Sequence, residues 1–228
     1  MHQLQKILLK RLLVENGQKY STLTQGYNFE ENVVFHLKQL VSSGFIEKLR
    51  DKYYITANGT KAITTYDLGT LENMGFKTFF LGFLCRFEDE YLLKEHLSGK
   101  LAFYNLPSDK PRFGEKIEDA LVRAFHEISD VKLSPESFVY VSLHLKTIKT
   151  SYNETLFDDA FAIYEVTIKE TIKDKMKLNN NIKWFSTSEI KKLKSRWPEI
   201  DYLIIDGDKS DLKSYQFVSD YLGEISSL

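Results

Sequence analysis

The sequence has a single cysteine and no long apolar run, and these absences exclude several classes of protein. Among its 228 residues only Cys85 carries a thiol, so no disulfide can form within the chain and nothing indicates an oxidising compartment. No apolar run approaches the ~18 residues that a membrane span needs. The N-terminal stretch MHQLQKILLKRLL carries spaced Lys and Arg and lacks a small-residue cleavage site, which favours a helix over a signal peptide. We therefore expect a cytoplasmic protein with no membrane partner.

Several kinds of chemical site are also missing from the sequence. It contains no glycine-rich phosphate loop, no zinc-ligand spacing, no nucleophile elbow, no internal repeat and no low-complexity tract. Hydrophobic residues make up 43% of the chain and aromatic residues 14%, which is enough for a packed core and argues against disorder. The formal net charge of −1 by itself indicates no partner.

The charges are unevenly divided along the chain. Residues 1–66 contain nine Lys or Arg against five Asp or Glu, a net charge of +4, and the remaining residues contain 22 against 27, a net charge of −5. A basic first part and an acidic second part indicate two units with different partners. We expect domains over residues 1–66 and 77–228, joined by a linker over 67–76.

The first part alternates helices with a short hairpin. An apolar stripe predicts a first helix that ends near residue 16, followed by one helical turn and a second long helix from about Phe29 to Ser42. Two short strands then flank Arg50-Asp51-Lys52 as a hairpin. On the second long helix we expect five apolar side chains to face the core: Val33, Val34, Leu37, Leu40 and Val41.

The segment FHLKQLVSSGFIEKLRDKYYITANG pairs a helix ending in glycine with a hairpin closing on a threonine and a glycine, and it resembles the second half of winged helix-turn-helix domains. The resemblance implies that the helix enters the major groove of double-stranded DNA while the hairpin contacts the backbone or the minor groove. Winged helices also serve as protein-docking or dimerisation modules, and that alternative stays open. The candidates for DNA contact are Asn32, His36, Lys38 and Gln39 on the helix and Lys48, Arg50 and Lys52 on the hairpin.

The second part predicts sheet, helix, sheet and helix in that order. After the central helix come two long alternating runs, FVYVSLHLKTI and AFAIYEVTI, with Asp158 and Asp159 in the expected loop between them. A capping box from Ser186 to Glu189 opens a last helix that runs through about Leu193. The strands expected before the central helix cover residues 77–87, 91–93 and 102–106.

This second part is organised around the stretch LPSDKPRFGEKIEDALVRAFHEISDVKL, residues 106–133. One interpretation of its charged residues is a solvated helix face with ion pairs four residues apart. The apolar residues that recur at the helical period are Ile117, Ala120, Leu121, Ala124, Phe125 and Ile128. The charged stripe opposite them consists of Glu115, Asp119, Arg123 and Glu127.

The same stretch resembles the Nudix box, whose pattern is G-x5-E-x7-R-E-U-x-E-E-x-G-U, with U an aliphatic residue. Glu115, Arg123 and Glu127 match the first Glu, the Arg and the first Glu of the EE pair. The resemblance implies an α/β/α sandwich with a mixed sheet, which with the winged helix makes an α+β chain. It also implies hydrolysis of nucleoside diphosphates linked to another group, by a divalent metal that glutamates hold. Glu127 is then the candidate metal ligand, with Mg²⁺ or Mn²⁺ as the ion if hydrolase activity remains.

The departures from the pattern fall on the metal site. Ala124 and Ile128 stand where the pattern has two of its glutamates, and Asp109 and Asp130 stand where it has glycines. A hard divalent cation needs several converging carboxylates, so the two apolar replacements predict a domain that binds a nucleotide-like ligand without cleaving it. On this basis no residue is assigned as catalytic.

Three functions remain open from the sequence. The first is a homodimeric, DNA-binding transcriptional regulator whose Nudix-derived domain senses a nucleotide-like small molecule, so that the ligand changes operator affinity. The second is a metal-dependent hydrolase of nucleoside diphosphate derivatives, and the third is a protein-interaction scaffold that binds neither DNA nor nucleotide. Ala124 and Ile128 favour the first and third over the second. The uneven division of charge favours the first over the third.

Overall fold

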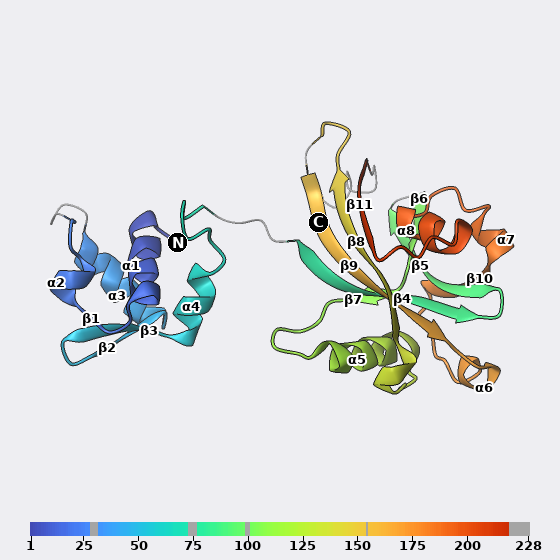
Figure 1. The fold of residues 1–228 in the computed structure, drawn as a ribbon, viewed down its shortest axis with the longest axis horizontal. Coiled ribbons are helices and arrows are strands. Elements are labelled where there is room, and N and C mark those ends of the chain that lie inside the picture. The colour runs from blue at the N-terminus through green and yellow to red at the C-terminus, as the bar shows by residue number, and fades with distance from the viewer. Residues whose placement is uncertain (28–31, 73–76, 99–100, 154, 219–228) are drawn as a thin grey trace. The chain divides into compact units, whose positions relative to one another are not determined.

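The chain divides into two compact units, Met1–Gly75 and Phe76–Leu228 (Figure 1). The structure, a computed structural model, describes residues 1–27, 32–72, 77–98, 101–153 and 155–218. No helix in these described ranges combines the length and the apolar composition that crossing a lipid bilayer requires.

The first unit has the predicted order of helix, short helix, helix and hairpin, with one further strand and a closing helix. Strand β1, which the sequence did not predict, pairs antiparallel with β3 and gives a three-stranded sheet in the order β1-β3-β2. The elements are α1 (Gln3–Val14), β1 (Gln18–Lys19), α2 (Tyr20–Leu23), α3 (Val33–Ser42), β2 (Ile46–Leu49), β3 (Lys52–Ile55) and α4 (Ala57–Ile63).

Glycine and threonine fix the junction between α3 and the hairpin. Gly44 has a φ of +69°, and its amide donates to the Val41 carbonyl at 3.0 Å, which ends α3 as the sequence predicts. The Thr56 hydroxyl donates to the Gly44 carbonyl at 2.6 Å, so it ties the end of the hairpin to the end of the helix. Gly59 lies so close to this junction that an added Cβ would stand 2.0 Å from the Phe45 carbonyl oxygen.

Helix α3 differs from its prediction at both its start and its faces. It begins at Val33, and the expected start at Phe29 lies outside the described residues. Leu37 is buried as expected, and so are Val33 and Leu40, but Val34 and Val41 are 46% and 39% exposed. The prediction that both valines face the core is wrong. The core of this unit packs against the opposite side of α3, which carries Val33, Leu37 and Leu40.

The segment expected to begin the linker packs on the first unit. Leu71 is buried in that unit's core, and its carbonyl accepts a hydrogen bond from Lys6 Nζ at 3.0 Å. Tyr66 also packs against this core, with the Lys6 ammonium over its ring. Residues 67–72 therefore belong to the first unit, and the remainder of the expected linker, 73–76, lies outside the described residues.

The second unit is a mixed sheet with helices on both faces, as Figure 1 shows for α5 on one side and α7 and α8 on the other. The helical segments are α5 (Ile117–Ser129), α6 (Glu170–Lys173), α7 (Thr187–Ile190), α8 (Pro198–Ile200) and a π-helical turn (Asp201–Ile205). The strands are β4 (Thr78–Phe87), β5 (Glu90–Ser98), β6 (Leu101–Asn105), β7 (Ser108–Asp109), β8 (Val139–Lys149), β9 (Thr155–Thr167), β10 (Ile182–Ser186) and β11 (Leu212–Val218).

Two pairs of strands in this sheet run parallel and the others antiparallel. The main path is β10-β5-β4-β9-β8-β11, with β6 beside β5 and β7 beside β4. The parallel pairs are β4 with β9 and β8 with β11. Strands β7 and β11 were not predicted, because β7 has two residues and β11 alternates exposed and half-buried side chains.

The alternation of side chains along the strands builds a separate core on each face. Phe83 of β4 packs against Phe125 and Phe138 on the α5 face, with ring centroids 5.6 and 5.9 Å away. Leu84, the next residue, lies in the core on the α7 and α8 face. This two-sided packing is the α/β/α arrangement that the sequence predicted.

Two local predictions about the second unit had different outcomes. The capping box at α7 is confirmed: the Glu189 amide donates to Ser186 Oγ, and the Ser186 amide donates to Glu189 Oε2 at 2.8 Å, although the helix ends at Ile190 rather than Leu193. The loop placement of Asp158 and Asp159 is wrong, because both lie within β9 and pair with β8.

Candidate functional site

The Nudix-box resemblance falls on β7, the loop after it and helix α5. The apolar face of α5 packs on the sheet as predicted, with Ala120, Leu121, Ala124 and Phe125 buried. Gly114, with a φ of +78°, occupies the turn that leads from the loop into the helix. The opposite, charged side of α5 therefore faces the loop that joins β7 to the helix.

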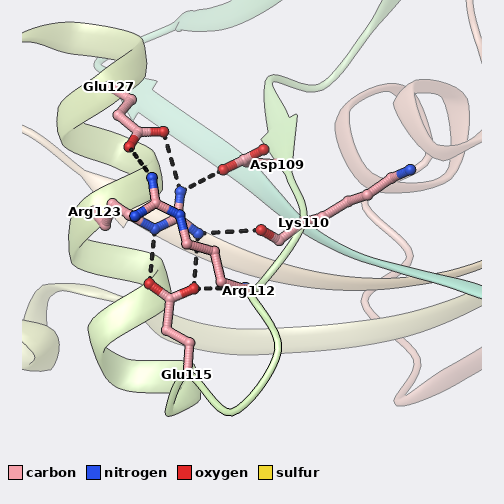
Figure 2. A network of polar contacts seen from close by, with 6 residues as sticks. All are labelled: Asp109, Lys110, Arg112, Glu115, Arg123 and Glu127. Atoms are coloured by element: carbon pink, nitrogen blue, oxygen red, sulfur yellow. Dashed lines mark hydrogen bonds and ion pairs between the residues drawn. The ribbon is translucent and has the colours of Figure 1, made fainter. Parts of the chain in front are cut away.

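Arg123 lies at the centre of a cluster of charges that connects these elements (Figure 2). Its Nε and Nη2 donate to the two carboxylate oxygens of Glu115 at 2.7 and 2.9 Å. Its Nη1 donates to Asp109 at 2.6 Å and to Glu127 at 3.1 Å, and Nη2 also donates to the Lys110 carbonyl at 3.1 Å. The expected ion pair four residues apart is formed between Arg123 and Glu127, but the side chain of Arg123 is only 16% exposed, so it does not lie on a solvated face.

The cluster shifts the acid–base behaviour of its members. Hydrogen bonds from the Arg123 guanidinium, and then from the Arg112 amide, lower the pKa of Glu115 to about 2. The same contact with Glu115, and a further one with Asp109, raises the pKa of Arg123. Both shifts favour the charged forms of Glu115 and Arg123, so each of the two groups holds the other in its ionised state.

Glu127, the candidate metal ligand, has both carboxylate oxygens on arginines. Oε2 accepts from Arg123 at 3.1 Å and Oε1 accepts from Arg112 at 3.2 Å. The positions where the pattern has glutamates carry Ala124, which is fully buried, and Ile128, which packs against the core. In the described ranges no three His, Cys, Asp or Glu side chains are grouped so as to hold a metal ion. These residues do not fit the oxygen-rich site that Mg²⁺ or Mn²⁺ needs.

A cleft of about 360 Å³ opens beside this cluster, on the α8 face of the sheet. Asp109 belongs to both, because it lines the cleft and pairs with Arg123. The cleft spans the ends of strands from several parts of the chain. Its lining residues are Thr78, Phe80, Lys94, His96, Asn105, Ser108, Asp109, Lys110, Phe157, Asp159, Phe161 and Trp197.

Aromatic rings and cations share the walls of the cleft. Phe80 and Phe161 lie with ring centroids 5.5 Å apart, and the Lys110 ammonium lies 5.0 Å from the Phe80 centroid. Lys94 lies close enough to His96 that its positive charge, after burial of the ring, lowers the His96 pKa. Aromatic faces with nearby ammonium groups can bind a planar base and its phosphates.

A buried ion pair supports one wall of the cleft. Lys146 Nζ donates to Glu199 at 3.0 Å, and neither side chain is exposed. The ammonium lies 3.9 Å from the Phe161 centroid and 4.2 Å from the Trp197 centroid, between two rings that line the cleft. Tyr215 of β11 donates to the other Glu199 oxygen at 3.3 Å. Burial raises the pKa of the neighbouring Asp159, despite the opposing effect of Lys146.

The residues of the cleft were not predicted from the sequence. The sequence pattern puts Asp109 at a glycine position of the box and Asp159 in an expected loop, but it places neither in a cleft, and Asp159 lies buried in β9. Lys146 did carry a signal, because the alternation of β8 places it on the same side as His144 and Ile148, which are buried. A lysine at such an inward position marks a buried charge that needs a partner.

The candidate DNA-contacting residues of the first unit lie on α3 and on the β2–β3 hairpin. Among the seven candidates, His36 alone is half-buried, and its ring stacks on His2 with ring centroids 4.2 Å apart. The Gln39 amide oxygen accepts from Gln5 Nε2 at 3.5 Å. The exposed candidates are Asn32, Lys38, Gln39, Lys48, Arg50 and Lys52.

Comparisons with known proteins give similar structures but no similar sequence. No family model matches the chain, and no curated protein matches its sequence. A MutT protein from Bacillus halodurans is similar in structure with 13% identity and a TM-score of 0.49, over 63% of this chain and 92% of that one. The Nudix domain of Shewanella oneidensis NrtR, solved with ADP-ribose, has 11% identity and a TM-score of 0.46, over 67% and 97%.

A third similar structure is a Nudix hydrolase from Nitrosomonas europaea, with 22% identity and a TM-score of 0.42, over 60% of this chain and 93% of that one. All three are Nudix proteins by their descriptions. At these identities and TM-scores, the function of this chain has to be argued from its own residues.

Proposed function

We propose that this chain is a homodimeric DNA-binding regulator whose second unit binds a nucleotide-like anion without hydrolysing it. The observation that carries the proposal is the contrast between the cleft and the box beside it. The cleft offers rings and ammonium groups to a ligand, whereas the box carboxylates are held by Arg123 and Arg112. Binding without cleavage is the behaviour that this combination supports.

The charge balance of the cleft favours an anionic ligand. Asp109 is paired with Arg123, and the buried Lys146 is paired with Glu199, so these four charges compensate one another. Among the other charged residues that line the cleft, Lys94 and Lys110 outnumber Asp159, so the field that a ligand meets is positive. A nucleoside diphosphate derivative places its base on the rings and its phosphates near these lysines. The Shewanella NrtR domain is a case of a Nudix domain solved with ADP-ribose, which makes ADP-ribose a suitable probe.

The first unit supports the DNA-binding half of the proposal. Its hairpin carries Lys48, Arg50 and Lys52, all exposed, and its one acidic turn residue, Asp51, pairs with Lys19 at 3.2 Å. A hairpin of this charge beside an exposed helix suits contact with a phosphate backbone while the helix meets base edges. Ligand binding would then change operator affinity through its differential affinity for two states of the dimer.

Isothermal titration with ADP-ribose tests the ligand-binding half of the proposal. We expect saturable binding by the wild-type chain, and a loss of affinity of about tenfold or more when Lys94 and Lys110 are both changed to Ala, because charge-assisted contacts are removed. The matched control is Lys191→Ala, an exposed lysine outside the cleft, which should bind as the wild type does. Equal affinities in all three proteins would contradict the assignment of the cleft.

A further inference from the structure

Helix α3 presents an apolar stripe to solvent. Val34, Lys38 and Val41 follow one another at helical spacing on its outer side, and Phe35 adjoins them. Val34 is 46% exposed, Phe35 48% and Val41 39%. Such a stripe on an exposed helix indicates a contact surface, because a solvated helix face is ordinarily polar.

The stripe forms one wall of a groove between α3 and the β2–β3 hairpin. The groove has a volume of about 420 Å³, and Tyr53 of the hairpin lies opposite the valines. The Lys48 ammonium lies 5.4 Å from the Tyr53 ring centroid, so a positive charge stands at the rim. Its lining residues are Tyr20, Val34, Leu37, Lys38, Val41, Ser42, Lys48 and Tyr53.

The charges around the groove favour duplex DNA over an apolar protein surface as the occupant. Lys38 lies within the stripe, and Lys48, Arg50 and Lys52 stand on the adjacent hairpin, all exposed. Phosphates on both sides of a major groove would meet these cations. Between the phosphates, the only apolar group that a base edge offers in the major groove is the C5-methyl group of thymine.

This inference rests on the proposed DNA-binding function. We propose that Val34 and Val41 of α3 contact thymine methyl groups, and that the first unit therefore prefers A·T-containing sites. Arg and Lys are the side chains that most often recognise guanine; α3 contains no arginine, and its one lysine, Lys38, is assigned here to a phosphate. Gln39 lies toward α1, where it accepts from Gln5, so the outer side of α3 reads mainly through its valines.

The test compares duplexes that differ only in the thymine methyl group. Fluorescence anisotropy with the full-length protein measures its affinity for an alternating d(A-T) duplex and for the same duplex with deoxyuridine in place of thymidine, at low salt. Loss of each contacted methyl should weaken binding by about fourfold, the effect of one buried methyl-sized group. In the double variant that combines Val34→Ala with Val41→Ala, the difference in affinity between the two duplexes should disappear. Val14→Ala, at a more exposed apolar position on α1, should retain it.

Each outcome of this test decides one question. Weaker binding to the uracil duplex, with the difference lost only in the α3 variant, supports thymine reading. Equal binding to both duplexes contradicts it while leaving DNA binding itself in place. Absence of binding to either duplex at low salt overturns both this inference and the DNA-binding proposal. A circular dichroism melt of the α3 variant confirms that the helix is intact, since the two valines are exposed.

Discussion

Arg123 and Lys146, both of which pair with carboxylates in the second unit, differ in what else surrounds them. Arg123 directs its guanidinium to three carboxylates and a backbone carbonyl, and its side chain remains 16% exposed. Lys146 is fully buried, pairs with the single carboxylate of Glu199, and lies between the rings of Phe161 and Trp197. The first cation fastens a loop to a helix, and the second supports the wall of a cleft.

The matched motif and the cleft beside it serve different purposes in the second unit. The residues that match a known pattern, Glu115, Arg123 and Glu127, satisfy one another and hold β7 against α5. The residues that face the cleft match no pattern. In the proposed function, the motif survives as a support for the fold, and ligand binding is assigned to side chains beside it.

The largest expected effect comes from an attempt to rebuild the box. Ala124→Glu places a carboxylate in the fully buried core beneath α5, and we expect a destabilisation of about 5 kcal/mol or more, because an unpaired buried charge and overpacking combine. Urea unfolding measures this, with the exposed His126→Glu on the same helix as control. A cost below about 1 kcal/mol would show that this position faces solvent and that a metal site could be restored.

The buried pair should be the next most sensitive site. Glu199→Gln leaves Lys146 buried without a counter-charge, which typically costs about 3–5 kcal/mol. Breaking the exposed pair of Lys177 with Asp130 by Lys177→Met should change stability far less, because solvent screens that pair. Chemical denaturation measures the loss of unfolding free energy in both variants. Similar losses in the two would mean that Lys146 reaches solvent.

Arg123→Lys should have a smaller effect than loss of the buried pair. Lysine keeps the charge but lacks the planar set of donors that reaches Glu115 and Asp109 together, so we expect a loss of about 1–3 kcal/mol. Thermal unfolding measures it, and Arg112→Lys serves as control because the Arg112 side chain is 69% exposed. Unchanged stability of the Arg123 variant would contradict the role of this residue as the fastening of the loop.

The smallest expected effect is a dependence on pH. The pKa of Glu115 is about 2 in the fold against an ordinary value of 4.5, so its ionised form stabilises the fold above pH 4.5. That contribution is lost as pH falls from 4.5 toward 2. Melting temperatures across this range should therefore fall less steeply for Glu115→Gln than for the wild type. Parallel curves for the two proteins would show that Glu115 is not held by Arg123.

Local patterns predicted the parts of the fold that depend on neighbours in sequence. The apolar face of α5 and the capping box at Ser186 follow from spacings of three and four residues, and both are confirmed. The cleft could not be predicted, because β4, β5, β9 and the segment at Trp197 meet there only after folding. Lys146 and its partner Glu199 are 53 residues apart, and nothing near Glu199 marks it as buried.

The valines of α3 show the same limit within one helix. Apolar residues occur around most of its circumference, so periodicity alone did not decide which of them face the core. The position of α1 and of the hairpin decides it, by burying Val33, Leu37 and Leu40 and leaving Val34 and Val41 outside.

In the proposed function, the cleft binds a nucleotide-like anion and the box beside it does not hydrolyse that anion. Phosphorus NMR of ADP-ribose with stoichiometric full-length protein and Mg²⁺ tests both parts in one sample. We predict that the two phosphorus resonances shift or broaden on addition of protein and that no phosphomonoester resonance appears during prolonged incubation. Appearance of AMP and ribose 5-phosphate would contradict the account, and it would show that Glu115, Arg123 and Glu127 still support hydrolysis.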